Sequence, residues 1–166
     1  MPKTIVPDYV FGSFSDISAE FLKKQNIKAL LCDVDNTLSP YEHATPNEAV
    51  REWVCEMQKN GIKIALVSNN NYERINTYNE ELKLVAYADA GKPSRKCYFK
   101  AARDLGVDIC DCAVLGDQLL TDCWSARRLK VKCFIVPPIN DKRDLFHRFK
   151  RAVEKPFMFV YNKRNK

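Results

Sequence analysis

The sequence predicts an α/β fold, in which a mainly parallel sheet lies between two layers of helices in a three-layer α/β/α, Rossmann-like arrangement. Two observations predict it: short apolar runs recur along the chain, and amphipathic stretches of helical length separate them. Strands that alternate with single helices are joined by right-handed crossovers, which make neighbouring strands parallel and place helices on both faces.

The size and composition of the chain indicate one globular domain. It has 166 residues, of which 46% are hydrophobic and 29% charged. We expect a single domain over residues 1–166, with its core at about 27–136. No apolar run approaches the ~18 residues that a membrane-spanning helix needs, and the N-terminus shows no secretory signal pattern. The odd number of cysteines, 7, fits reduced thiols in the cytoplasm.

The first part of the chain contains one strand between two helices. A helix at 16–24 is expected to pack on the edge of the sheet. The run I-K-A-L-L-C-D-V at 27–34 predicts a buried strand, because parallel strands covered on both faces are almost continuously apolar. The helix at 45–60 has Pro46 at an early position and apolar residues on one face, and Gly61 ends it.

The remaining elements continue the alternation. Short apolar runs predict the strands, and amphipathic spacing predicts the helices between them. The helix at 94–105 is followed by Gly106, a residue common just after helix C-termini. In chain order, the elements after Gly61 are strand 62–68, helix 72–82, strand 84–88, helix 94–105, strand 112–116, helix 121–129 and strand 131–136.

Residues suited to chemistry follow four successive strands, where open α/β sheets place their sites. Asp33 and Asp35 end the first strand. Two carboxylates this close repel one another unless a cation neutralises them, and Mg²⁺ is the natural cation for an all-oxygen site. Alone, the pair is also compatible with a solvated turn.

Three further groups extend this pattern. The segment S-N-N-N at 68–71 precedes a helix, so that it could cradle a phosphate; a plain N-cap run is the alternative. Lys92 is placed to face a phosphoryl group or the aspartates, and a surface lysine beside a turn is its alternative. Asp117 and Asp122 follow the fourth strand. The conjunction of four acids and one lysine at four strand ends predicts one shared site.

The motifs D-V-D-N-T-L at 33–38, V-S-N-N at 67–70, K-P at 92–93 and G-D-Q-L-L-T-D at 116–122 resemble the four-motif signature of the haloacid dehalogenase (HAD) superfamily. More narrowly, S-N-N-N and G-D-Q-L-L-T-D are similar to the motifs of the IIIA-type, YqeG-like phosphatases. The resemblance covers nearly the whole chain, with no departure at any of the four motifs. It implies a HAD core and an Mg²⁺-dependent phosphatase that forms an aspartyl-phosphate; Mn²⁺ would suit the same oxygen ligands.

The resemblance also implies a role for each site residue. Asp33 would be the nucleophile, and Asp35 the general acid and base. Lys92 would neutralise charge on the nucleophile and on the transferring group. The implied phosphate-binding residues are Thr37, Ser68, Asn69 and Lys92, the implied metal ligands are Asp33, Asp35 (through its backbone carbonyl) and Asp117, and Asp122 would support the metal site or Lys92.

The spacing between the motifs indicates a site without a cap domain. Only a short loop fits between Leu38 and Pro46, and only one helix and one strand fit between Asn71 and Gly91. An open site cannot easily enclose a small metabolite and expel water. It better suits a phosphate carried on a lipid headgroup, on a nucleic acid end or on a protein.

The C-terminal tail, at about 141–166, holds the basic excess of a chain whose net charge is +6. Lysines and arginines from Lys142 onward far outnumber the acids, and aromatic residues lie among them. We expect a basic helix from Asp141 to Val153, and we leave the run F-M-F-V-Y at 157–161 open between a strand and a disordered arm. This tail suits peripheral contact with an anionic membrane surface; the alternatives are packing of the aromatics on the core and a solvated basic tail.

Some YqeG-like relatives act as phosphatidylglycerophosphate phosphatases. The resemblance therefore implies an anionic phospholipid headgroup as the phosphorylated partner and phosphatidylglycerol as the product, and nucleic acid is not required. The alternatives are a HAD phosphatase for nucleotide, nucleic acid or protein phosphoesters, and a non-catalytic binding module, against which the intact acids argue. The expected location is the cytoplasm, with peripheral contact to the membrane.

Overall fold

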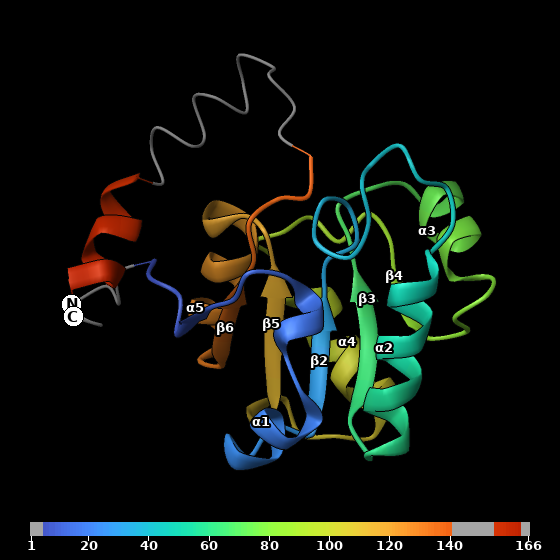
Figure 1. The fold of residues 1–166 in the computed structure, drawn as a ribbon, viewed down its shortest axis with the longest axis horizontal. Coiled ribbons are helices and arrows are strands. Elements are labelled where there is room, and N and C mark those ends of the chain that lie inside the picture. Colours follow the sequence, from blue (N-terminus) through green and yellow to red (C-terminus); the bar gives the residue numbers. More distant parts are fainter. Residues whose placement is uncertain (1–4, 141–154, 164–166) are drawn as a thin grey trace.

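A six-stranded parallel sheet forms the centre of the computed structural model, which describes residues 5–140 and 155–163 (Figure 1). The order of the strands across the sheet is β1-β6-β5-β2-β3-β4, and each neighbouring pair is parallel. The strands are β1 (Tyr9–Val10), β2 (Ala29–Cys32), β3 (Lys63–Val67), β4 (Val85–Tyr87), β5 (Cys112–Gly116) and β6 (Lys132–Ile135). The predicted parallel α/β sheet is confirmed.

Helices cover both faces of the sheet, which gives the predicted three layers (Figure 1). Side chains alternate between the faces of a strand, so Leu30 and Cys32 of β2 enter one apolar cluster and Leu31 enters the other. The first cluster lies under α1 (Ala19–Lys24), α2 (Glu48–Lys59) and α3 (Tyr72–Asn79), and the second under α4 (Lys96–Leu105) and α5 (Trp124–Leu129). Within the described residues, no helix is both long and apolar enough to span a bilayer.

The edge of the sheet beside β6 differs from the prediction. Instead of a helix alone, the short strand β1 pairs with β6, and α1 follows it in the chain. The helix begins at Ala19 rather than at residue 16, because the Ser18 hydroxyl accepts the Phe21 N–H and caps it. Similarly, α2 begins at Glu48 rather than at residue 45. The Asn47 side chain accepts the Val50 N–H and caps the helix, so Pro46 lies before the helix and not at an early position within it.

The connections near the motifs are short. The chain passes from β2 to α2 through one loop, and from β3 to β4 through α3 alone. Neither of these described segments contains an additional domain, in agreement with the predicted spacing. No domain inserted in these two connections therefore covers the carboxyl ends of β2 to β5.

Residues 155–163 of the tail form a helix. The run F-M-F-V-Y at 157–161, which the sequence leaves open between a strand and a disordered arm, is therefore neither. Phe157 and Met158 are partly buried against the apolar cluster under α4 and α5. The Tyr161 hydroxyl accepts a hydrogen bond from the Val10 N–H at 3.1 Å, while Phe159 is 70% exposed. Part of the aromatic run therefore packs on the core. The helix predicted from Asp141 to Val153 lies outside the described residues.

Candidate active site

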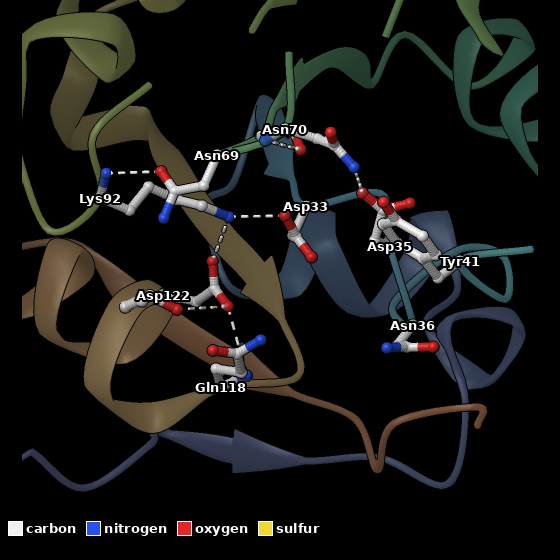
Figure 2. A pocket seen from close by; sticks show the side chains of 11 residues that line it. Asp33, Asp35, Asn36, Tyr41, Asn69, Asn70, Lys92, Gln118 and Asp122 are labelled. Carbon is white, nitrogen blue, oxygen red and sulfur yellow. Dashed lines mark hydrogen bonds and ion pairs between the residues drawn. The ribbon is translucent and has the colours of Figure 1, made fainter. Parts of the chain in front are cut away.

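A pocket of about 310 Å³ lies where the carboxyl ends of the strands meet (Figure 2). Parallel strands bring these ends to one edge of the sheet, so residues that are far apart in the sequence become neighbours there. The residues that line the pocket are Asp33, Asp35, Asn36, Tyr41, Ser68, Asn69, Asn70, Lys92, Gln118, Thr121 and Asp122. Five of the residues predicted for the site are among them, together with the predicted supporting residue Asp122.

A tight turn after β2 positions the first two acids. Asn36 has a φ of 63°, a left-handed conformation that asparagine tolerates better than most residues, and its N–H donates to the Ser39 carbonyl at 2.7 Å. Asp33 is buried at the start of this turn. The Thr37 hydroxyl donates to Asp33 Oδ2 at 3.1 Å and approaches Asp117 Oδ1 at 3.4 Å. Thr37, predicted to bind phosphate, therefore contacts the carboxylates and does not line the pocket.

Lys92 lies between two of the carboxylates (Figure 2). Its Nζ donates to Asp33 Oδ1 at 2.6 Å and to Asp122 Oδ1 at 2.7 Å, and its side chain is 3% exposed. Burial opposes the charged lysine, but Asp122 and Asp33 outweigh it and raise the Lys92 pKa well above its ordinary value. Lys92 is thus a buried, charged residue and not the surface lysine of the alternative interpretation.

Asp122 reaches Lys92 because of a glycine and a π-helical turn. The turn Leu119–Cys123 follows β5, and Asp122 Oδ2 accepts the Gln118 N–H at 3.2 Å and the Thr121 hydroxyl at 3.3 Å. A Cβ atom on Gly116 would lie only 2.2 Å from Cγ of Asp122. Only glycine at the end of β5 lets the Asp122 carboxyl pack so closely against the strand.

Three carboxylates form a cluster that could hold a cation. Oxygens of Asp33, Asp117 and Asp122 lie within 4.8 Å of one another, and all three residues are largely buried. Burial, together with Asp122, raises the pKa of Asp33 to about 6 against the attraction of Lys92. Burial and then Asp33 and Asp122 raise the pKa of Asp117 well above its usual range. One lysine therefore does not neutralise three acids, and this all-oxygen donor set fits a divalent cation.

The loop after β3 contributes Ser68 and Asn69. Ser68 is buried and its Oγ accepts the Asn70 N–H at 3.1 Å, while Asn69 Oδ1 accepts the Lys92 N–H at 2.7 Å. The N-cap of α3 is Asn71, whose side chain accepts the Arg74 N–H. Because the cap comes later in the chain, the first three residues of S-N-N-N are left at the pocket wall.

Asp35 has partners that the sequence motifs did not predict. Its Oδ1 accepts from Arg74 Nη2 at 2.9 Å, and its Oδ2 accepts from Asn70 Nδ2 at 2.9 Å (Figure 2 shows the second bond). The Asp35 carboxylate is thus directed toward α3, and the cluster of three carboxylates consists of Asp33, Asp117 and Asp122. The only signal of Arg74 in the sequence is its position in the first turns of a helix that follows the site segment.

Comparisons with known proteins agree on one family. The family of haloacid dehalogenase-like hydrolases matches residues 40–130. The chain is 34% identical over 155 residues to the Bacillus subtilis protein named "Probable phosphatase YqeG", and the match covers 93% of this chain and 90% of that protein.

Solved structures share the fold. CbbY from Rhodobacter sphaeroides, in complex with phosphate, aligns with a TM-score of 0.57 and 14% identity over 72% of this chain and 90% of that chain. The cobalt-bound deoxy-D-mannose-octulosonate 8-phosphate phosphatase YrbI from Haemophilus influenzae aligns with a TM-score of 0.53 and 13% identity over 80% of this chain and 90% of that chain.

Proposed function

Because the chain belongs to the haloacid dehalogenase-like hydrolases and is a HAD-type phosphatase, we propose that it hydrolyses a phosphomonoester through an aspartyl-phosphate on Asp33. The observation that carries this proposal is the setting of the Asp33 carboxylate. One oxygen is held by Lys92 and the other by Thr37, at the wall of the pocket. A carboxylate oriented in this way is a competent nucleophile toward phosphorus.

The reaction has two steps, formation of the aspartyl-phosphate and its hydrolysis. An Asp33 oxygen bonds to phosphorus while the bond from phosphorus to the leaving oxygen breaks, and Asp35 gives that oxygen a proton. Asp35 then takes a proton from water, whose oxygen bonds to phosphorus and releases the Asp33 carboxylate and inorganic phosphate. Ser68 and Asn69 hold the phosphoryl oxygens. Lys92 balances the charge that develops on the transferring group, because phosphoryl transfer depends chiefly on positioning and on cations.

The acid cluster supports an Mg²⁺ requirement. We assign the Asp33 and Asp117 carboxylates and the backbone carbonyl of Asp35 as ligands, while Asp122 remains with Lys92. Bound Mg²⁺ would supply positive charge next to the phosphoryl oxygens. The raised pKa values of Asp33 and Asp117 are the physical reason for expecting a cation, since a divalent ion would offset both the burial and the repulsion between carboxylates that raise them.

Magnesium is expected to stabilise the wild-type protein and to stabilise Asp117→Asn much less. A ligand at about 100 times its Kd adds about 2.7 kcal/mol to the free energy of unfolding, which corresponds to a rise in Tm of several degrees for a chain of this size. The measurement is thermal unfolding with EDTA and with increasing Mg²⁺. Asp111→Asn, at the other end of β5, is the matched control and should keep the full rise. An equal rise in Asp117→Asn would contradict the ligand assignment.

For the substrate, we propose the phosphomonoester of an anionic phospholipid, phosphatidylglycerophosphate, with phosphatidylglycerol as the product. The pocket opens among short loops, without a described domain over the β2 to β5 strand ends. Large apolar side chains are exposed on the segments that follow the carboxyl ends of four strands, as an interface with a bilayer requires. They are Tyr41, Tyr72, Trp124 and Ile139. The basic excess after residue 141 would add attraction to anionic lipid.

A substrate screen tests this assignment. With Mg²⁺, we expect phosphate release from phosphatidylglycerophosphate in mixed micelles to exceed release from nucleotides, phosphopeptides and sn-glycerol 3-phosphate. Tyr72→Ser is expected to slow cleavage of the lipid in vesicles and to leave cleavage of glycerol 3-phosphate unchanged, since Tyr72 is 72% exposed and lies outside the pocket lining. Release from nucleotides or phosphopeptides but not from the lipid would favour the alternative substrate class. No release from any of them would favour a binding module.

A further inference from the structure

The carboxylate that we assign as acid and base is held by two donors from one segment. Asp35 Oδ1 takes its bond from Arg74, and Asp35 Oδ2 takes its bond from Asn70. A carboxylate has about four lone-pair positions, so one on each oxygen remains for a proton or a substrate. One donor on each oxygen therefore fixes the plane of the carboxyl group without blocking it, and Asp35 still lines the pocket.

Arg74 is itself fixed by contacts on several sides. Its Nη1 donates to the Ala44 carbonyl at 3.0 Å, and its guanidinium lies 5.3 Å from the centre of the Tyr78 ring. Tyr78 is fully buried, and its hydroxyl is 2.6 Å from the Ser39 hydroxyl. Only 14% of the Arg74 side chain is exposed. Arg74 thus links the loop after β2, the Asp35 carboxylate and α3.

Burial of such an arginine needs an explanation other than stability. Ion pairs removed from water contribute little net stability, because desolvation of both charges offsets their attraction. Among the described residues, the Nε of Arg74 in addition has no hydrogen-bond partner although it is buried, which is unfavourable. An arrangement with these costs is expected where it positions a reacting group.

We propose that Arg74 is a positioning residue, which fixes the carboxyl plane of Asp35 so that its proton is delivered to the leaving oxygen. This inference rests on the proposed function. As the bond from phosphorus to the leaving oxygen breaks, the proton passes from Asp35 to that oxygen, and the guanidinium stabilises the carboxylate that forms. Arg74 does not contact the substrate in this step. Its effect should therefore depend on how strongly the leaving group needs a proton.

Two substrates with different leaving groups test the proposal. p-Nitrophenolate leaves as a stable anion, whereas the alkoxide of sn-glycerol 3-phosphate must be protonated. For Arg74→Gln, we expect kcat/KM to fall by about 10²-fold for glycerol 3-phosphate, the lower end of what general acid catalysis contributes, and by less than tenfold for p-nitrophenyl phosphate. Asn70→Ala should show the same selectivity with a smaller loss. Because Asn70→Ala retains Arg74, it still tests the proposal if Arg74→Gln folds poorly.

Arg51 provides the matched control. It too donates to a loop carbonyl, that of Pro46, and pairs with a carboxylate, that of Glu81. Arg51→Gln should leave both substrates unchanged. Equal losses for both substrates in Arg74→Gln and Asn70→Ala, or no loss in either variant, would overturn the inference and leave the proposed function intact. Failure of the wild-type protein to release phosphate from these two substrates and from phosphatidylglycerophosphate would overturn the proposed function and this inference with it.

Discussion

Replacement of Asp33 by asparagine is expected to abolish turnover and to leave the protein at least as stable as the wild type. The amide cannot form the bond to phosphorus on which both steps depend. Loss of a nucleophile typically lowers kcat about 10⁴-fold or more, and the groups that bind the substrate account for the residual activity. The asparagine side chain is of the same size as the aspartate and keeps an oxygen that can accept from Lys92 or Thr37. The fold should therefore be retained.

The expected gain in stability follows from the pKa of Asp33. Burial first, and then Asp122, raise this pKa from 3.8 to about 6, so the folded state binds the proton more tightly than the unfolded state. When the pKa of an acid is higher in the folded state than in the unfolded state, stability is lost as the pH rises from the unfolded-state pKa to the folded-state pKa. An asparagine side chain has no such titration. Without divalent cations, the Tm of Asp33→Asn relative to wild type should rise between pH about 4 and about 6 and then level off.

Phosphate release at saturating substrate with Mg²⁺ measures the loss of turnover. Thermal unfolding in EDTA across this pH range measures the gain in stability. Asp111→Asn, which replaces an acid paired with Lys28 at the far end of β5, should show neither effect. Turnover by Asp33→Asn near the wild-type rate would refute the nucleophile assignment. A large fall in Tm would instead show that the Asp33 charge is needed for folding.

The site was predictable as far as the topology determines it. In a parallel sheet, the last residue of each strand lies at the same edge, so the residues that follow β2, β3, β4 and β5 must meet there. The register aligns Cys32 with Leu66 and with Leu115, which brings the next residues of three strands together. For this reason Asp33, Lys92 and Asp122 could be placed in one site before any geometry was known.

Features that depend on side-chain direction were not predictable. No motif indicated that Asp35 turns toward Arg74, because that contact joins two segments 39 residues apart through a single guanidinium. Strand β1 has only two residues, too few for a periodic pattern. The helix at 155–163 contains an apolar run that resembles a strand, and its packing of Phe157 on the core overrides that local preference.

Replacement of Lys92 by methionine is expected to lower both turnover and stability strongly. Lys92 forms the ion pairs with Asp33 and Asp122, and all three side chains are nearly inaccessible to water. Removal of one partner from a buried pair leaves an uncompensated charge and typically costs about 3–5 kcal/mol. Methionine preserves most of the volume of the lysine stem, so the loss can be attributed to the charge. Turnover should fall because the transferring group loses a fixed cation. Urea unfolding in EDTA and phosphate release measure the two effects.

The double variant Lys92→Met/Asp122→Asn separates charge from packing. Its second change removes one of the carboxylates left unpaired by the first, so the double variant should be more stable than Lys92→Met alone. Turnover should not recover, since Asp33 still lacks its cation. If Asp122→Asn instead costs the same in the Lys92→Met background as in the wild type, the two residues are not coupled. The 2.7 Å ion pair would then contribute nothing to the arrangement of the site. Coupling would mean that the charge of Lys92 stabilises the buried Asp122 carboxylate, and a loss of turnover that Asp122→Asn does not restore would assign the effect on the reaction to the pair of Lys92 with Asp33.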